Sequence, residues 1–174
     1  YFLSDYAVKY NPIKERLHLS FECPKPLLKV QVYRKNGIEQ YSAIFAENGA
    51  LLDPTYEVLL RTEKKLKREL PLLALPVEKV GSDIHKEINN IVLQMKKSNL
   101  DFFSEMILNE KGNLTVLLSV NGRPSSVFMG RDQFAEKFKK MIEIIGYMSK
   151  KRSIPSIINL TNAKKVVVKF SENL

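Results

Sequence analysis

The sequence has very few of the residues on which metal binding and nucleophilic catalysis depend. It contains one cysteine, Cys23, and two histidines, His18 and His85, in 174 residues. A single cysteine excludes an internal disulfide, and one cysteine with two scattered histidines does not supply the ligand set of a structural zinc site. We interpret Cys23 as a small, half-buried hydrophobic residue and both histidines as solvated surface side chains.

Common enzyme motifs are absent as well. The sequence contains no GxGxxG, Walker A, GxSxG or HExxH pattern. The segment "NGRPSSVFMGRD" has the serines, glycines and aspartate of a phosphate loop. However, Asn121-Gly122 is typical of a hairpin turn, and Gly130 of the break between a strand and a helix. Because catalysis needs convergent acids, bases, nucleophiles or metals, the sequence indicates a protein that is not an enzyme and uses no cofactor.

Long apolar runs are also missing. No stretch of about eighteen apolar residues occurs, and the start, "YFLSDYAVKY", does not have the pattern of a signal peptide. Because this start has no initiator methionine, we expect the chain to be a fragment. A membrane anchor in the preceding part of the protein would then lie outside this sequence.

Positive charge is in excess. Lysine and arginine number 28 against 19 acidic residues, which gives a net charge of +9. Such a surface favours anionic partners. Nucleic-acid sites usually cluster their lysines around aromatic residues, whereas these lysines are spread along the whole chain, so no nucleic-acid partner is expected. A basic nucleic-acid-binding module remains the alternative, and it predicts an affinity for DNA or RNA that falls steeply with salt.

The N-terminal segment has the pattern of a β-hairpin. Residues 6–10 and 16–22 alternate apolar and polar side chains, and Leu17, Leu19 and Phe21 fall on one face. The "CPKP" segment follows, and two prolines so close together interrupt a strand ladder. The sequence therefore predicts a domain boundary at about residue 24, with the hairpin making few contacts beyond it.

The middle of the chain contains patterns of both strands and helices. Strands are expected at residues 27–34 and 41–46, followed by a turn and a short strand in "ENGALLD". Residues 54–68 have the composition of a helix. The segment "ELPLLALPV" contains two prolines, so we do not expect it to be a central strand throughout. Ser82 is predicted to cap a helix that ends near "KKSN".

The second half has the clearest pattern. Three strands at residues 102–108, 114–120 and 125–129 are joined by turns rich in asparagine and glycine. A helix is then expected up to about residue 149, and two extended runs joined at "TNAK" close the chain. The predicted helix has an apolar stripe of Phe134, Phe138, Met141, Ile142 and Ile145. The predicted fold class is α+β, a mostly antiparallel sheet with helices packed on it.

Five segments together resemble the FtsQ/DivIB family of bacterial cell-division proteins. They are "RLHLSFECPKPLLKV", "YSAIFAENGALLD", "FFSEMILNEKGNLTVLLSVNGRPSSVFMG", "GRDQFAEKFKKMIEIIGYMSKK" and "IPSIINLTNAKKVVVKF". The resemblance implies that residues 1–24 are the C-terminal part of a POTRA-like domain and residues 25–174 the β domain. Asn159 and Thr161 depart from the family, which has an acidic residue and an arginine at these positions.

The resemblance also implies a function. Members of this family are non-catalytic divisome scaffolds, single-pass proteins of the cell membrane with their bulk outside the cytoplasm. They dock the coiled-coil division proteins FtsB/DivIC and FtsL through a strand near the C-terminus. The corresponding residues here are Asn162, Lys164, Lys165, Val166, Val167, Val168, Lys169 and Phe170. The alternative is that this strand is only a sheet edge, protected from aggregation by its lysines.

Overall fold

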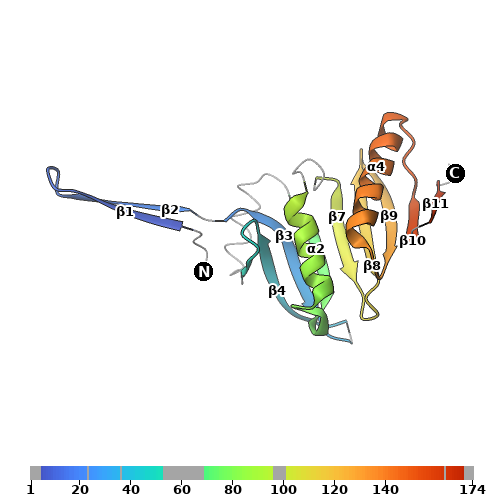
Figure 1. Cartoon of the computed structure of the whole chain (residues 1–174), viewed down its shortest axis with the longest axis horizontal. Coiled ribbons are helices and arrows are strands. Elements are labelled where there is room, and N and C mark those ends of the chain that lie inside the picture. Colours follow the sequence, from blue (N-terminus) through green and yellow to red (C-terminus); the bar gives the residue numbers. More distant parts are fainter. Residues whose placement is uncertain are drawn as a thin grey trace.

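The computed structural model describes residues 5–22, 24–35, 37–52, 69–95, 101–162 and 164–170. The helix expected at residues 54–68 and the residue Cys23 lie outside these ranges. Most of the described residues belong to one nine-stranded sheet, and the N-terminal hairpin extends away from it (Figure 1).

The main sheet is mixed. Its spatial order is β11-β10-β9-β8-β7-β6-β3-β4-β5. Neighbouring strands are parallel in β3–β6, β6–β7 and β9–β10, and antiparallel in the remaining pairs. The prediction of a mostly antiparallel sheet is confirmed, but the sequence did not predict the parallel pairs. The strands are β3 (Pro26–Tyr33), β4 (Glu39–Ala46), β5 (Leu51–Leu52), β6 (Leu72–Pro76), β7 (Phe103–Leu108), β8 (Leu114–Val120), β9 (Arg123–Gly130), β10 (Ile157–Asn162) and β11 (Lys165–Lys169).

Each α-helix of the described ranges connects two parallel neighbours. The helix α2 (Asp83–Gln94) leads from β6, through the short 3-10 helix η1 (Val77–Lys79), to β7, and α4 (Phe134–Lys150) leads from β9 to β10. Both helices cover the same face of the sheet (Figure 1). A crossover helix must pack on a sheet face to connect parallel strands, so these two units leave the opposite face without a described helix.

The core lies between the helices and the sheet. The predicted stripe of α4 is confirmed, because Phe134, Phe138, Met141 and Ile145 are 0%, 1%, 1% and 3% exposed. The Phe138 ring stacks on Phe103 of β7 with centroids 6.0 Å apart. Burial of four large side chains of about 1.5–3 kcal/mol each explains why α4 is held on the sheet.

The start of α2 confirms one prediction and corrects another. The Ser82 hydroxyl accepts a hydrogen bond from the backbone N–H of His85 at 3.3 Å, so Ser82 is the N-cap. The interpretation of His85 as a solvated surface residue is wrong, because its side chain is buried, with 3% exposure. Its Nδ1 accepts the backbone N–H of Gly81 at 3.0 Å. The ring of a residue in the first helical turn can thus bond to the backbone just before the helix and become buried. The spacing of residues in the sequence does not predict this.

The strand β6 is a second correction. It lies between β3 and β7 in the middle of the sheet and pairs with both in parallel. Residues 69–77 are not a strand throughout, as expected, but residues 72–76 within them form a central strand that was not predicted from the sequence. Pro71 precedes the strand and Pro76 is its last residue, so the leucine-rich stretch between them keeps its ladder donors.

The N-terminal hairpin is a separate two-stranded sheet. Its strands β1 (Asp5–Asn11) and β2 (Arg16–Glu22) pair only with each other among the described strands, as the alternation predicted. One face carries three apolar cross-strand pairs, whose members are 54–68% exposed: Tyr6 and Phe21, Val8 and Leu19, and Tyr10 and Leu17. The assignment of this hairpin to a POTRA-like domain, with a domain boundary at about residue 24, stays a prediction.

Candidate partner-docking edge

The structure brings all the predicted docking residues together on one hairpin at the edge of the main sheet. Asn162 ends β10, Lys164 lies in the turn, β11 contains the next five, and Phe170 follows directly. Within the described part of the chain, β11 pairs with β10 and with no other strand. The last strand therefore has a paired side and an open side.

The orientation of the β10 backbone follows from its pairing with β9. The Ser126 N–H donates to the Ser156 carbonyl at 2.9 Å, in the parallel ladder between the two strands. In a strand, the backbone groups of successive residues point to opposite sides. Ile158 therefore directs its N–H and carbonyl toward β9, as Ser156 does. Ile157 and Asn159 direct theirs toward β11.

The same alternation fixes the orientation of β11. Asn159 is opposite Val167 and Ile157 is opposite Lys169, so Val167 and Lys169 direct their backbone groups inward to β10. Val168, which lies between them, directs its N–H and carbonyl to the open side. The ladder groups available to a partner strand at this position are those of Val168, and not those of Val167.

Apolar side chains flank the open side on both faces of the sheet. Val168 is opposite the fully buried Ile158 and so shares the helix-covered face with Val166, which contacts the core. Val167 is on the opposite face. Val168, Phe170 and Val167 are 36%, 41% and 49% exposed. An added strand would find apolar contacts above and below its backbone.

Side-chain amides shape the end of β10. The Asn159 Oδ1 accepts hydrogen bonds from the Thr161 N–H at 3.0 Å and from the Thr161 hydroxyl at 2.7 Å. The ladder to β11 is irregular between Asn159 and Asn162, and the Asn162 Oδ1 accepts the Lys164 N–H at 2.9 Å. Asn159 and Thr161 thus satisfy each other with neutral hydrogen bonds within the hairpin.

A buried lysine connects α4 to the strands beside this hairpin. Lys137 is 3% exposed, and its Nζ donates to the Met129 carbonyl at 2.8 Å and to Asp132 Oδ1 at 2.7 Å. The hydrogen bond and charge of Lys137 hold the pKa of Asp132 below its usual value. Sequence reasoning missed Lys137, although its place three residues after Phe134 lies within the apolar stripe.

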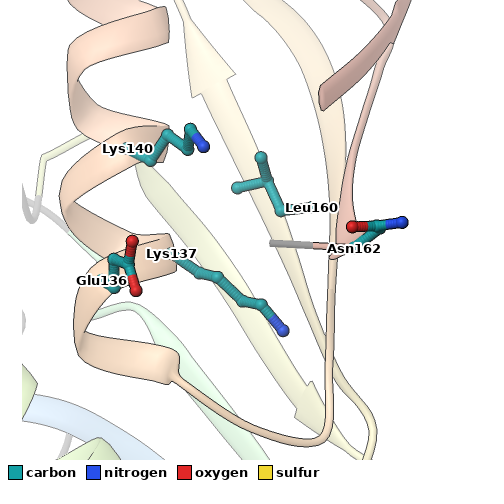
Figure 2. A pocket seen from close by; sticks show the side chains of 5 residues that line it. All are labelled: Glu136, Lys137, Lys140, Leu160 and Asn162. Atoms are coloured by element: carbon teal, nitrogen blue, oxygen red, sulfur yellow. The ribbon is translucent and has the colours of Figure 1, made fainter. Parts of the chain in front are cut away.

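The cleft at this corner is small. Figure 2 shows its lining side chains, with Lys137 extending from α4 toward the strands and Leu160 between α4 and the end of β10. The cavity volume of about 10 Å³ has room for one water molecule. The lining residues are Glu136, Lys137, Lys140, Leu160 and Asn162. This cleft beside the candidate edge is therefore too small to enclose a drug-sized ligand.

Two further observations limit the chemistry of the described residues. They contain no group of three or more histidine, cysteine, aspartate or glutamate side chains placed to hold a metal ion. No helix in the described ranges combines the length and apolar character needed to cross a membrane.

Comparison with known proteins adds no relationship. No protein-family model matches this chain, and no curated protein matches its sequence. The structural class of this protein therefore follows from its fold and from the edge strand β11 alone. The chain contains an α+β domain with helices on one face of a mixed sheet and an open strand near its C-terminus.

Proposed function

We propose that this chain is the extracytoplasmic part of a divisome scaffold of the FtsQ/DivIB type. The protein is non-catalytic and is anchored in the cell membrane by a single N-terminal span that precedes this sequence. It docks small coiled-coil division proteins of the FtsB/DivIC and FtsL types through β11. The ordered resemblance of five sequence segments supports the family, and the open edge supports the mode of docking.

The observation that carries this proposal is the outer side of β11, which pairs with no other described strand. An extended segment of a partner can add to such an edge, because main-chain hydrogen bonds supply affinity and the flanking side chains supply specificity. Val168 offers one donor and one acceptor to such a segment. The half-exposed valines and Phe170 offer apolar area on both faces of the sheet.

A pair of substitutions at Val168 tests the proposal. Val168→Pro removes the outward N–H and places a ring in the path of an added strand, but it breaks no hydrogen bond to β10. Val168→Ala shortens the side chain but keeps the N–H, so it is the control for the loss of apolar contact. Both variants would be compared with the wild type as bait in a pull-down from bacterial envelope extract.

We expect the wild type and Val168→Ala to retain a small coiled-coil membrane protein, and Val168→Pro to lose it. The loss should be at least about tenfold in affinity, which corresponds to about 1.4 kcal/mol. The melting temperatures of the three proteins should agree closely. Equal retention by a folded Val168→Pro would show that β11 is only a protected edge.

A further inference from the structure

A group of basic side chains gathers at the end of the sheet where α4 finishes. Arg123 begins β9, directly after the β8–β9 turn, and the other members lie at the C-terminal end of α4 and just beyond it. This end carries the loop that leads from α4 to β10 (Figure 1). The basic end surface, as we call it, consists of Arg123, Tyr147, Lys150, Lys151 and Arg152.

Direct contacts hold the two parts of this surface together. The Arg123 Nη1 donates to the Arg152 carbonyl at 3.5 Å, and the Asn121 Nδ2 donates to the Ser149 hydroxyl at 3.3 Å. Asn121, Arg123, Arg152 and Ile154 line an open cleft of about 270 Å³. No carboxylate is among these lining residues. Arg123 and Arg152 thus line the same cleft, and a hydrogen bond from the Arg123 side chain to the Arg152 main chain joins them.

The positive charge of this surface exceeds what the structure itself uses. Arg123, Lys150, Lys151 and Arg152 are exposed, and none forms an ion pair with another described residue. The C-terminal end of a helix favours cations, but its dipole is equivalent to only about half an elementary charge. One of these side chains is enough for that role, so several positive charges remain for an external anion.

An aromatic ring accompanies the cations. Tyr147 is 55% exposed, and the Lys151 Nζ lies 4.8 Å from the centre of its ring. Tyrosine and lysine side chains with an apolar body and a polar tip are typical of the interface between a bilayer and water. Single-stranded nucleic acids are instead bound by several stacking rings along a groove. The described part of this surface offers Tyr147 alone.

The topology sets the direction in which this surface faces. β3, β6 and β7 are parallel to one another, and β9 is antiparallel to β8, which is antiparallel to β7. β9 therefore runs in the direction of β3, and both strands begin at the same end of the sheet. The chain enters the main sheet at that end, coming from the N-terminal hairpin. The basic end surface thus lies at the end of the main sheet where the N-terminal hairpin joins it.

We propose that the basic end surface binds the phosphate groups of anionic lipid headgroups at a bilayer surface. The inference uses the proposed function only in one respect, which is that an N-terminal anchor would bring this end of the sheet toward a membrane. The residues that would contact the lipid are the two arginines that line the open cleft and the exposed tyrosine. Binding is electrostatic, so it weakens as salt rises.

The experiment measures partition of the 174-residue chain onto vesicles by sedimentation. One set of vesicles contains phosphatidylcholine with phosphatidylglycerol, and the other contains phosphatidylcholine alone. Each basic side chain near an anionic surface contributes a factor of about five, so Arg123→Gln with Arg152→Gln should lower the partition coefficient about 25-fold. The matched control is Arg34→Gln with Arg131→Gln. Both control arginines are exposed and follow the opposite ends of β3 and β9, so the net charge changes equally at the far end of the sheet.

We expect binding to vesicles with phosphatidylglycerol, unaffected by the control pair and lost in the first pair. Lys150→Gln with Lys151→Gln should give a similar loss, and this pair leaves the Arg123–Arg152 contact intact if the arginine pair proves unstable. Equal losses from both arginine pairs would overturn the proposal in favour of diffuse charge. Equal binding to both kinds of vesicle would also overturn it, as would tighter binding of single-stranded DNA through the same arginines.

The vesicles contain no division protein, and the pull-down at Val168 requires no anionic lipid. A failure to bind lipid would therefore not count against docking at β11. A failure of docking at β11 would not count against lipid binding. Val168→Pro provides the internal check, because it should bind the anionic vesicles as the wild type does.

Discussion

The buried histidine predicts how the stability of this domain depends on pH. His85 is 3% exposed, and its Nδ1 accepts the Gly81 N–H at 3.0 Å, which requires a neutral ring. The other ring nitrogen is 3.2 Å from the side-chain amide of Asn89, whose buried Oδ1 has no partner. Turning the Asn89 amide over would let Oδ1 accept the Nε2–H. Both ring nitrogens are thus used by the neutral form.

Burial lowers the pKa of His85 below its usual value of about 6.5. A lowered pKa means that the unfolded chain takes up the proton more readily than the folded one. The contribution to stability is therefore complete above about pH 6.5, declines as the pH falls below that value, and stops declining once the pH passes the folded pKa. Within that window the free energy of unfolding should fall by up to about 1.4 kcal/mol per pH unit.

Urea unfolding at a series of pH values would measure this decline. His85→Asn is the informative variant, because its Oδ1 lies near the position of Nδ1 and can accept the Gly81 N–H without titrating. The variant should be less stable at neutral pH, since the smaller side chain leaves a cavity, but its curve should be flatter below about pH 6.5. His18→Asn removes the other histidine, on the exposed strand β2, and is the matched control. A constant difference between wild type and His85→Asn across the whole range would refute the reasoning.

Three further substitutions test the packing and the edge by urea unfolding. Lys137→Met keeps the volume but leaves a buried main-chain carbonyl without its donor, so stability should fall by about 1–3 kcal/mol; no change would mean that water replaces the ammonium group. Ser125→Ala removes a buried hydroxyl that has no hydrogen-bond partner, and stability should stay the same or rise by about 1 kcal/mol; a clear loss would reveal a missed partner. Val167→Pro removes the N–H directed at β10 and should cost about 1 kcal/mol or more, unlike Val168→Pro; equal stabilities would contradict the assigned orientation, and a larger loss in Val168→Pro would reverse it.

Periodicity in the sequence predicted several elements and their buried faces, but not β6 and not which strands are neighbours. The stripe from Phe134 to Ile145 predicts which face of α4 is buried, because a helix repeats every 3.6 residues. The alternation in β8 predicts the buried side in the same way. Neither pattern states which strand lies next to which. The parallel pairs of β6 and β10 arise because α2 and α4 each return the chain to the same end of the sheet, and that is a tertiary property.

The burial of single polar side chains was the second feature that the sequence did not predict. His85 and Lys137 belong to types that are usually exposed, and both are buried because specific backbone groups satisfy them. The location of the candidate edge was predictable from the final alternating run. The outward residue was not, because it depends on the hydrogen bond between Ser126 and Ser156 in the neighbouring ladder.

The lysines of β11 can make the strand both a protected edge and a docking edge. Two copies of this chain could pair their open edges in antiparallel fashion. One register that makes hydrogen-bonded pairs of the outward residues places Val168 of one copy opposite Val166 of the other. In that register Lys165 faces Lys169 twice, and like charges directly opposite each other are destabilising by up to about 1 kcal/mol per pair. The same charges do not oppose a partner strand that lacks them.

Protection against self-pairing and docking of another protein are therefore compatible properties of one strand. Lys169→Glu converts both repulsive pairs of the antiparallel dimer into attractive ones and should tighten self-association by about tenfold or more. Lys164→Glu makes the same change of charge in the turn, outside the paired residues, and serves as the control. Sedimentation velocity over a range of concentrations would measure both variants. Self-association that is equal for the two, or absent from Lys169→Glu, would mean that charge at β11 does not decide which strand can join the edge.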